Sequence, residues 1–240
     1  NPLDWRALEA LGKVHYARAV AAGDPALRRD LAGRAVRYLR QARAVAPGAQ
    51  DDSAKWTLSR AYLFLGPEWS HEALGVLTSM DGGKFPEYAE TLGPLLLETG
   101  DARGAEALYR SRVDALPPGN SPARAAALLG VGLALKNQNR RTEALDAILT
   151  ALASGPDAET VSRAEYAHGW LFYAQGMYRE SLAHYKKSLD GSTTPALPWY
   201  WIGKVNEKLK NSPAARDAYR TALRLDPGFE AAARKTSPRR

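Results

Sequence analysis

The chain has no cysteine among its 240 residues, and it has only two methionines, four phenylalanines and four histidines. The absence of cysteine excludes disulfide bonds and thiolate metal ligands, but it does not separate a cytoplasmic protein from a periplasmic one. No stretch approaches the ~20 apolar residues that a transmembrane helix requires. The chain begins at Asn1 rather than Met, so we expect that residues precede it, with a cleaved signal peptide as one alternative.

The sequence also lacks the local motifs of common enzyme classes. It has no Gly-x4-Gly-Lys phosphate loop and no Gly-x-Ser-x-Gly nucleophile motif. The four histidines form no His-x3-His or His-Glu-x2-His pair. His168 and His184 lie on two helices of one expected hairpin, but the apolar position of His168 favours a packed, hydrogen-bonded side chain over a metal ligand. We therefore expect no catalytic residue, no metal site and no cofactor.

The positive charge is unevenly distributed. Residues 1–120 hold 15 Lys and Arg and 15 Asp and Glu, whereas the remaining residues hold 18 and 11, so the second half carries the whole net charge of +7. A basic half indicates an acidic partner surface, nucleic acid or anionic lipid. The alternative is a solvated, arginine-rich surface without a partner.

Small residues recur along the chain at a nearly constant distance. Gly93, Gly132, Gly169 and Gly203 stand 39, 37 and 34 residues apart, and a small residue follows each of them by twelve positions. A repeat of this length is typical of one helical hairpin copied along the chain. A small residue lets the two helices of a hairpin cross closely, and a proline after the second helix ends it.

The last copy is the most regular, and it resembles the tetratricopeptide repeat (TPR) pattern of W-x2-L-G-x2-Y, then A-x3-F, then P. Its matching residues are Trp199, Ile202, Gly203, Ala215, Tyr219, Ala222 and Pro227. Asn206 stands where the family usually has tyrosine. Weaker copies precede this one, the first of them irregular, and the resemblance covers nearly all of the chain.

The resemblance implies an all-α fold, a right-handed superhelical solenoid of antiparallel helix hairpins. We expect a single TPR array over residues 1–240, because hairpins of this kind bury their apolar faces only by stacking. The expected repeats are residues 4–47, 51–84, 86–117, 122–156, 158–193 and 196–227. Residues 228–240 are expected to form a partial cap or the start of a further helix.

Three local features carry separate expectations. Gly12 and Ala35 are 23 residues apart, so either the first hairpin is longer than the others or Gly12 is not its crossing glycine. Asp52 and Ser53 are candidate N-caps of the third helix. Pro94 lies inside an apolar helical pattern, where a helix is expected to bend or to start late.

The resemblance also places a binding site, because the first helix of each TPR hairpin lines a concave groove that holds partner peptides. In the fifth copy, the candidate residues are spaced by three, four and three, which puts them on one helical face. The candidate partner-binding residues are Arg163, Tyr166, Trp170 and Tyr173 of the fifth copy, Tyr200, Lys204 and Lys208 of the sixth, and Lys136 of the fourth. Rings provide rigid apolar area, and cations pair with carboxylates. The alternative is that these rings only pack on a neighbouring helix.

These features predict a non-catalytic scaffold that binds a protein or peptide partner, favouring an acidic one, within a larger assembly. One alternative is a nucleic-acid-binding helical repeat that uses the basic C-terminal half. Pentatricopeptide RNA readers have a similar period but lack the Gly, Ala and Pro set, so nucleic acid is not the expected partner. Another alternative is a ligand-sensing regulatory TPR protein. The Lys and Asn pattern of chaperone-binding carboxylate clamps is not reproduced, which argues against a heat-shock chaperone tail.

Overall fold

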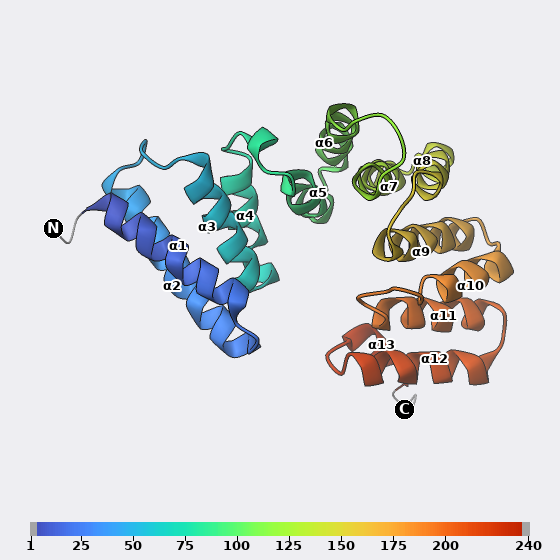
Figure 1. The fold of residues 1–240 in the computed structure, drawn as a ribbon. Coiled ribbons are helices and arrows are strands. Elements are labelled where there is room, and N and C mark those ends of the chain that lie inside the picture. The colour runs from blue at the N-terminus through green and yellow to red at the C-terminus, as the bar shows by residue number, and fades with distance from the viewer. Residues whose placement is uncertain (1–3, 237–240) are drawn as a thin grey trace. The chain divides into compact units, whose positions relative to one another are not determined.

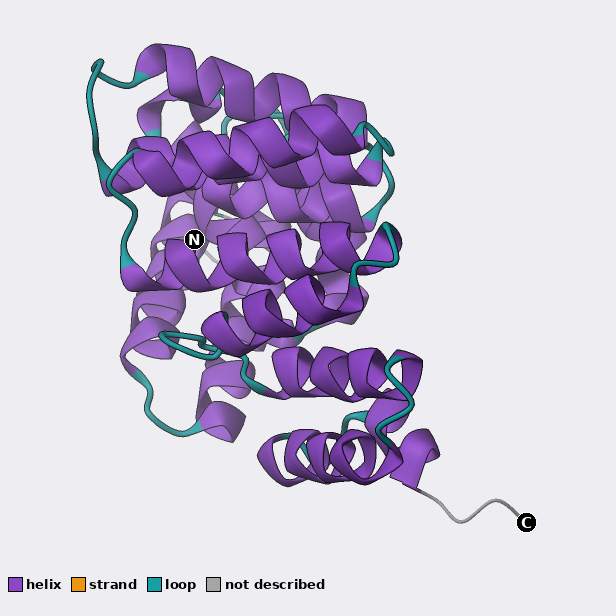
Figure 2. Ribbon diagram, turned by 90° about the vertical axis from the view of Figure 1, so that its right-hand side faces the viewer, coloured by secondary structure: helices purple, strands orange, loops and turns teal. Residues whose placement is uncertain are grey.

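A computed structural model describes residues 4–236 of the chain. These residues form thirteen α-helices and two short 3₁₀ helices, and Figure 2 shows helices and loops throughout them. None of the helices in this range combines the length and apolarity that crossing a membrane requires. The chain divides into two compact units, residues 1–99 and residues 100–240, and each unit is described by itself.

The N-terminal unit is built from five α-helices joined by short loops and 3₁₀ turns (Figure 1). They are α1 (Trp5–Ala21), α2 (Pro25–Val45), α3 (Asp52–Leu65), η1 (Pro67–Trp69), α4 (Ser70–Leu77), η2 (Gly82–Lys84) and α5 (Tyr88–Glu98). Each α-helix contacts the next one along the chain. The short connections explain this order, because helices joined by a few residues pack as antiparallel neighbours.

The first hairpin is longer than the others, and Gly12 is its crossing glycine. Gly12 is buried, and a Cβ atom at this position would lie 2.6 Å from Leu39 Cγ on α2. Only glycine therefore fits at this crossing without a shift of Leu39. The two helices have 17 and 21 residues, which accounts for the greater distance between their small residues.

Two boundaries in the N-terminal unit differ from the sequence expectation. The N-cap of α3 is Asp51, whose side chain accepts a hydrogen bond from the Ala54 N–H at 2.8 Å. The prediction of Asp52 or Ser53 was wrong, because three consecutive residues can cap and only the loop geometry selects among them. Pro94 lies within α5, which already begins at Tyr88, so this helix does not start late.

The C-terminal unit contains eight α-helices (Figure 1). They are α6 (Ala102–Ala115), α7 (Pro122–Asn137), α8 (Arg141–Ala153), α9 (Ala158–Ala174), α10 (Tyr178–Lys187), α11 (Ala196–Lys208), α12 (Ser212–Leu225) and α13 (Glu230–Thr236). The pairs α7 with α8, α9 with α10, and α11 with α12 form hairpins, and each hairpin contacts the next.

Small residues sit at the helix crossings of this unit, as the repeat pattern predicts. A Cβ atom on Gly132 would lie 2.8 Å from Ile148 Cγ1, and one on Gly203 would lie 2.5 Å from Tyr219 Cε1. Ala144 and Ala215 are buried on the opposite helices. Larger side chains at these four positions would hold the helices apart.

A partly buried cluster of polar side chains links α6 to the segment between α7 and α8. Gln138 Nε2 donates to Glu106 Oε2 at 2.8 Å, and Arg140 donates to the same oxygen at 2.9 Å. Burial opposes ionisation of Glu106, but the hydrogen bonds from Gln138 and Arg110 and the charge of Arg140 lower its pKa overall. These contacts fix α6 against the next hairpin.

The division between the two units falls after Thr99, between α5 and α6. This point lies inside the expected third repeat, residues 86–117. Each unit has its own packed helices, and the single array over residues 1–240 stays a prediction.

Candidate functional site

The predicted site residues lie on α7, α9 and α11, the first helices of the three C-terminal hairpins. Lys136, near the end of α7, places its ammonium nitrogen 5.1 Å from the ring centroid of Trp170 on α9. This cation–ring contact joins the fourth and fifth copies. Both side chains are half-buried, so they form part of the surface and not only of the core.

The rings of α9 pack on α10 and α11 through two residues that the sequence analysis did not select. Tyr173 meets Trp201 edge-on at 5.3 Å, and Tyr166 meets the buried Tyr185 at 5.4 Å. Trp201 also stacks on Tyr185 at 5.8 Å. Burial raises the pKa of Tyr166, and a hydrogen bond with Trp201 partly opposes this shift. The rings therefore pack on the next helix and stay partly exposed, and their role in partner binding stays a prediction.

Tyr200 lies at the edge of this ring cluster, where its ring meets Trp201 edge-on at 6.1 Å. Its ring contacts Tyr219 at 5.6 Å and Phe229 at 5.2 Å, which places it against α12 and the loop before α13. The neighbouring Trp201, and not Tyr200, connects α11 to the rings of α9. Trp199, Tyr200 and Trp201 are consecutive in the sequence, but adjacent residues on a helix point in different directions, so the sequence does not show which ring faces α9.

None of the four predicted cations makes an ion pair with residues 4–236. They are Lys136, Arg163, Lys204 and Lys208. Burial lowers the pKa of Lys136, since a charged ammonium is costly where water is partly excluded. We call Lys136, Arg163, Tyr166, Trp170, Tyr173, Lys204 and Lys208 the aromatic–basic surface.

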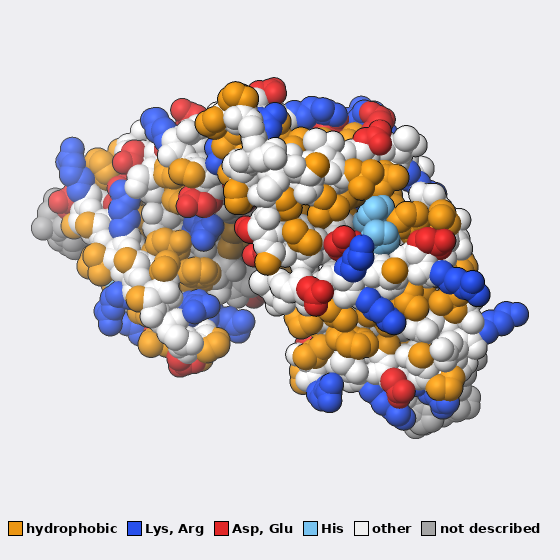
Figure 3. Space-filling model, turned by 45° about the vertical axis from the view of Figure 1, so that its right-hand side comes forward, with side chains coloured by type: hydrophobic (Ala, Val, Ile, Leu, Met, Phe, Trp, Pro, Cys, Tyr) orange, Lys and Arg blue, Asp and Glu red, His pale blue; other side chains and the backbone are white. Residues whose placement is uncertain are grey.

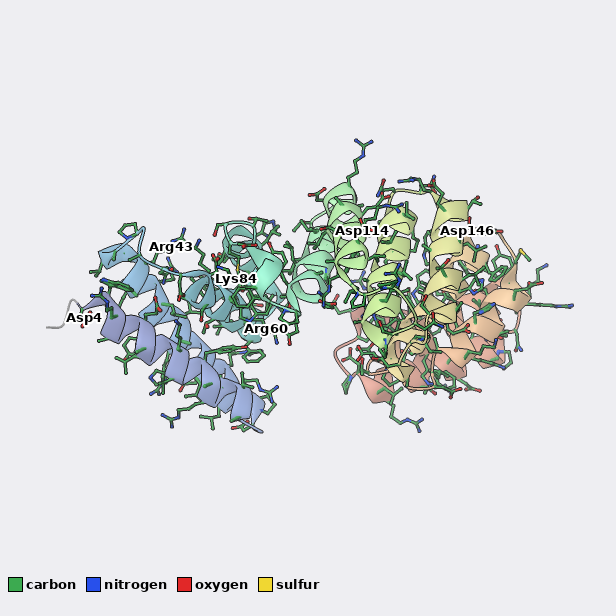
Figure 4. The ribbon with its side chains drawn as sticks, turned by 45° about the horizontal axis from the view of Figure 1, so that its top comes forward. Asp4, Arg43, Arg60, Lys84, Asp114 and Asp146 are labelled. Carbon is green, nitrogen blue, oxygen red and sulfur yellow. The ribbon has the colours of Figure 1, made fainter. Side chains whose placement is uncertain are left out.

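A hollow of about 390 Å³ lies elsewhere in the same unit, between α6, α7 and α8. Asp114 and Asp146, both labelled in Figure 4, line it together with apolar side chains of α7. None of the eight predicted site residues lines this hollow. Its mixed polar and apolar walls are a second feature that the sequence pattern did not indicate.

Solved structures with low sequence identity share this architecture. A tetratricopeptide repeat protein from Parabacteroides merdae has a TM-score of 0.70 and 16% identity, covering 98% of this chain and 84% of that one. PilW, a widely conserved type IV pilus biogenesis factor, has a TM-score of 0.65 and 15% identity, covering 94% and 98%. PilF of Pseudomonas aeruginosa has a TM-score of 0.58 and 15% identity, covering 95% and 98%. At these identities the likeness shows the fold alone, and the predicted all-α helical-repeat class is confirmed.

Sequence comparison gives a consistent assignment at the level of the family. Among curated proteins, no sequence matches this chain. The family model described as tetratricopeptide repeat matches residues 90–159 and 166–228, which together make up more than half of the chain. The chain therefore belongs to the tetratricopeptide repeat family.

Proposed function

We propose that this protein is a non-catalytic scaffold whose aromatic–basic surface binds an extended, acidic segment of a partner protein. Stacked TPR hairpins present the first helices of successive repeats side by side, which suits a chain that runs across several of them. The aromatic–basic surface extends over three such helices, α7, α9 and α11. The proposal assigns no reaction to any of its residues.

The observation that carries the proposal is the state of Lys136. Its ammonium group is half-buried against Trp170 and has no carboxylate partner among residues 4–236. A partly desolvated cation without a counter-charge destabilises the free protein, and a carboxylate from a ligand would offset that cost. An acidic side chain or a C-terminal carboxylate beside Trp170 fits this position.

The rings supply the apolar part of the same contact. Trp170, Tyr166 and Tyr173 are half-buried, and the last two are held from beneath by the packed rings of Tyr185 and Trp201. Rings that are already fixed lose little conformational entropy when a ligand covers them. Large aromatic residues near the centre of an interface often contribute ~2 kcal/mol or more, and Trp170 is our choice of anchor.

A peptide library displayed on phage and selected on the wild-type protein tests this function. We expect the selected peptides to be rich in Asp and Glu, with one apolar residue in common. The Trp170→Ala variant should bind such a peptide about 30-fold more weakly, which corresponds to ~2 kcal/mol. The matched control is Trp56→Ala, because Trp56 is a half-buried tryptophan of the other unit that stacks on Phe85 at 5.0 Å. Equal binding by wild type and Trp170→Ala would contradict the proposal.

Nucleic acid is the competing ligand, because residues 100–240 hold 21 Lys and Arg and 14 Asp and Glu. The salt dependence of the binding affinity distinguishes a nucleic-acid ligand from a peptide ligand. Affinity for nucleic acid falls steeply with salt because many counterions are released, whereas a peptide anchored on rings loses affinity only modestly. A steep decrease for single-stranded RNA, with no peptide recovered, would favour the nucleic-acid alternative.

A further inference from the structure

Three side chains of metal-binding types meet between α9 and α10. Glu165 and His168 are three residues apart on α9 and so share a face, and His184 approaches them from α10. His184 Nδ1 and Glu165 Oε2 are 2.6 Å apart, and the two imidazole rings have centroids 4.0 Å apart. One ligand atom from each of the three residues lies within 4.8 Å of the other two. Figure 3 shows histidine side chains at the surface of this unit.

His168 is not the hydrogen-bonded histidine that its apolar position led us to expect. Its side chain is buried, with an exposed fraction of 8%, and it makes no hydrogen bond with residues 4–236. Burial, reinforced by the neighbouring His184, lowers the pKa of His168 to about 4. The imidazole is therefore neutral at neutral pH and keeps a nitrogen lone pair that can bind an ion.

Phe172 holds both imidazoles in place. Its ring stacks on His168 at 4.8 Å and on His184 at 5.1 Å. The three rings form one packed group that joins α9 to α10. This packing limits the rotation of the imidazoles and keeps their nitrogen atoms close to Glu165, as a bound ion would require.

We propose that Glu165, His168 and His184 bind a divalent transition-metal ion of the Zn²⁺ type. Imidazole and carboxylate groups are ligands of Zn²⁺ and of its late first-row neighbours. Tetrahedral bonds of about 2.0–2.2 Å separate ligand atoms by roughly 3.4 Å, which lies between the present 2.6 Å contact and the 4.8 Å limit. Small side-chain rotations therefore suffice, and a fourth position remains for water or another ligand.

Two cations compete with a metal ion for Glu165. One is the proton that joins His184 Nδ1 to Glu165 Oε2, which must leave this contact, for Nε2 of the same ring or for solvent, when the ion binds. The other is Lys187, whose Nζ lies 4.0 Å from Glu165 Oε1. The charged and titratable groups that face the site are Glu165 and His168 from α9, and His184 and Lys187 from α10. Metal affinity should consequently decrease as the pH falls.

The test is Zn²⁺ titration of the full chain, without a histidine tag and after treatment with a chelator, by isothermal calorimetry. Co²⁺ serves as a second probe, because its visible absorption reports coordination by nitrogen and oxygen. We expect one ion per chain. Glu165→Gln and His184→Gln should each weaken binding at least ~100-fold, since even residues outside the ligand shell change metal affinity by 10–100-fold. His71→Gln, at an exposed histidine of α4, is the matched control and should bind like wild type.

Lys187→Ala sharpens the test without removing a ligand. This variant takes away a competing cation, so Zn²⁺ affinity should rise by up to about fivefold. Circular dichroism verifies that each variant stays helical. If a ligand variant unfolds, the Co²⁺ spectrum of the wild type and the Lys187→Ala affinity decide the question. No saturable binding of a single ion, or unchanged binding by Glu165→Gln and His184→Gln, would overturn the proposal.

Discussion

In the N-terminal unit, Arg60 lies over the ring of Trp56 at 5.5 Å, and in the C-terminal unit Lys136 lies over Trp170 at 5.1 Å. The two pairs share a geometry but differ in what else the cation touches. Arg60, labelled in Figure 4, also donates to Thr91 Oγ1 at 3.2 Å. Lys136 has no such partner among residues 4–236. The cation over the tryptophan therefore has a hydrogen-bond partner within the N-terminal unit, whereas in the C-terminal unit the ammonium of Lys136 can still bind a ligand.

Charge alone does not separate the two units. Residues 1–99 hold 12 Lys and Arg and 12 Asp and Glu, whereas residues 100–240 hold 21 and 14. Yet α2 of the N-terminal unit carries six arginines and one acidic residue, so the balanced sum conceals a strongly basic helix. The half-buried ammonium of Lys136, which lies beside Trp170 without a hydrogen-bond or ion-pair partner among residues 4–236, distinguishes the aromatic–basic surface, and net charge does not.

The largest expected effect tests whether both units use small residues in the same way. Gly203→Leu and Gly12→Leu should each destabilise their own unit by roughly 3 kcal/mol, because a Cβ atom already lies 2.5 Å from Tyr219 and 2.6 Å from Leu39 respectively. Hydrogen exchange measured by mass spectrometry resolves the two units separately. Gly75→Ala is the control, because a Cβ at Gly75 of α4 meets nothing within 4 Å, and it should be neutral or stabilising by up to ~1 kcal/mol. Equal effects of all three variants would refute the crossing assignment.

A smaller effect is expected from matched helix caps in the two units. Asp51 accepts from the Ala54 N–H, and Asp157 accepts from the Thr160 N–H, both at 2.8 Å. Replacing either by Ala should cost ~1 kcal/mol, measured by thermal unfolding. Hydrogen bonds from Thr160 lower the pKa of Asp157 in the folded protein. The stability that this cap contributes is therefore fully present above the pKa of Asp157 in the unfolded chain, and it is lost as the pH falls through the pKa in the folded protein. If only one of the two substitutions lowered the free energy of unfolding, the two units would differ in local stability.

The smallest effect is a pH dependence confined to the C-terminal unit. The unfolded chain protonates His168 near pH 6.5, whereas burial and the charge of His184 keep its folded pKa at about 4. The unfolded state therefore binds more protons between these values, and stability should decrease as the pH falls through this window. We expect less than ~1 kcal/mol, because nearby solvent weakens the effect. The measurement is hydrogen exchange of the C-terminal unit at several pH values. If the stability of a His168→Gln variant depended on pH as steeply as that of wild type, the assignment of this effect to His168 would be wrong.

The sequence predicted the features that depend on spacing along one helix or between repeated helices. The crossing positions Gly132, Gly203, Ala144 and Ala215 are all buried, because a repeat that must stack leaves few choices there. The regular period also explains why the family model matches from residue 90 onward. The N-terminal hairpin follows the same packing rule at Gly12, but its longer helices hide the period.

The features that the sequence did not predict depend on rotation and on contacts between helices. Trp201 faces α9 and Tyr200 faces α12, and a difference of one residue in helix phase decides between them. The sequence placed His168 and His184 on one hairpin, where they can approach each other, but it did not indicate Glu165, because the contact of Glu165 with His184 crosses the hairpin. The prediction of no metal site rested on local spacing and on the apolar position of His168, and our proposal replaces it.

The affinity of two charge variants for a selected acidic peptide tests the central claim most directly. Lys136→Met and Arg60→Met each remove a cation that lies over a tryptophan while keeping an apolar side chain. If the aromatic–basic surface is the binding site, calorimetry should show at least a ~10-fold loss for Lys136→Met, because hydrogen bonds to charged groups contribute about 1.5–3 kcal/mol. Arg60→Met should bind like wild type. Unchanged binding by Lys136→Met, or an equal loss for Arg60→Met, would contradict the account.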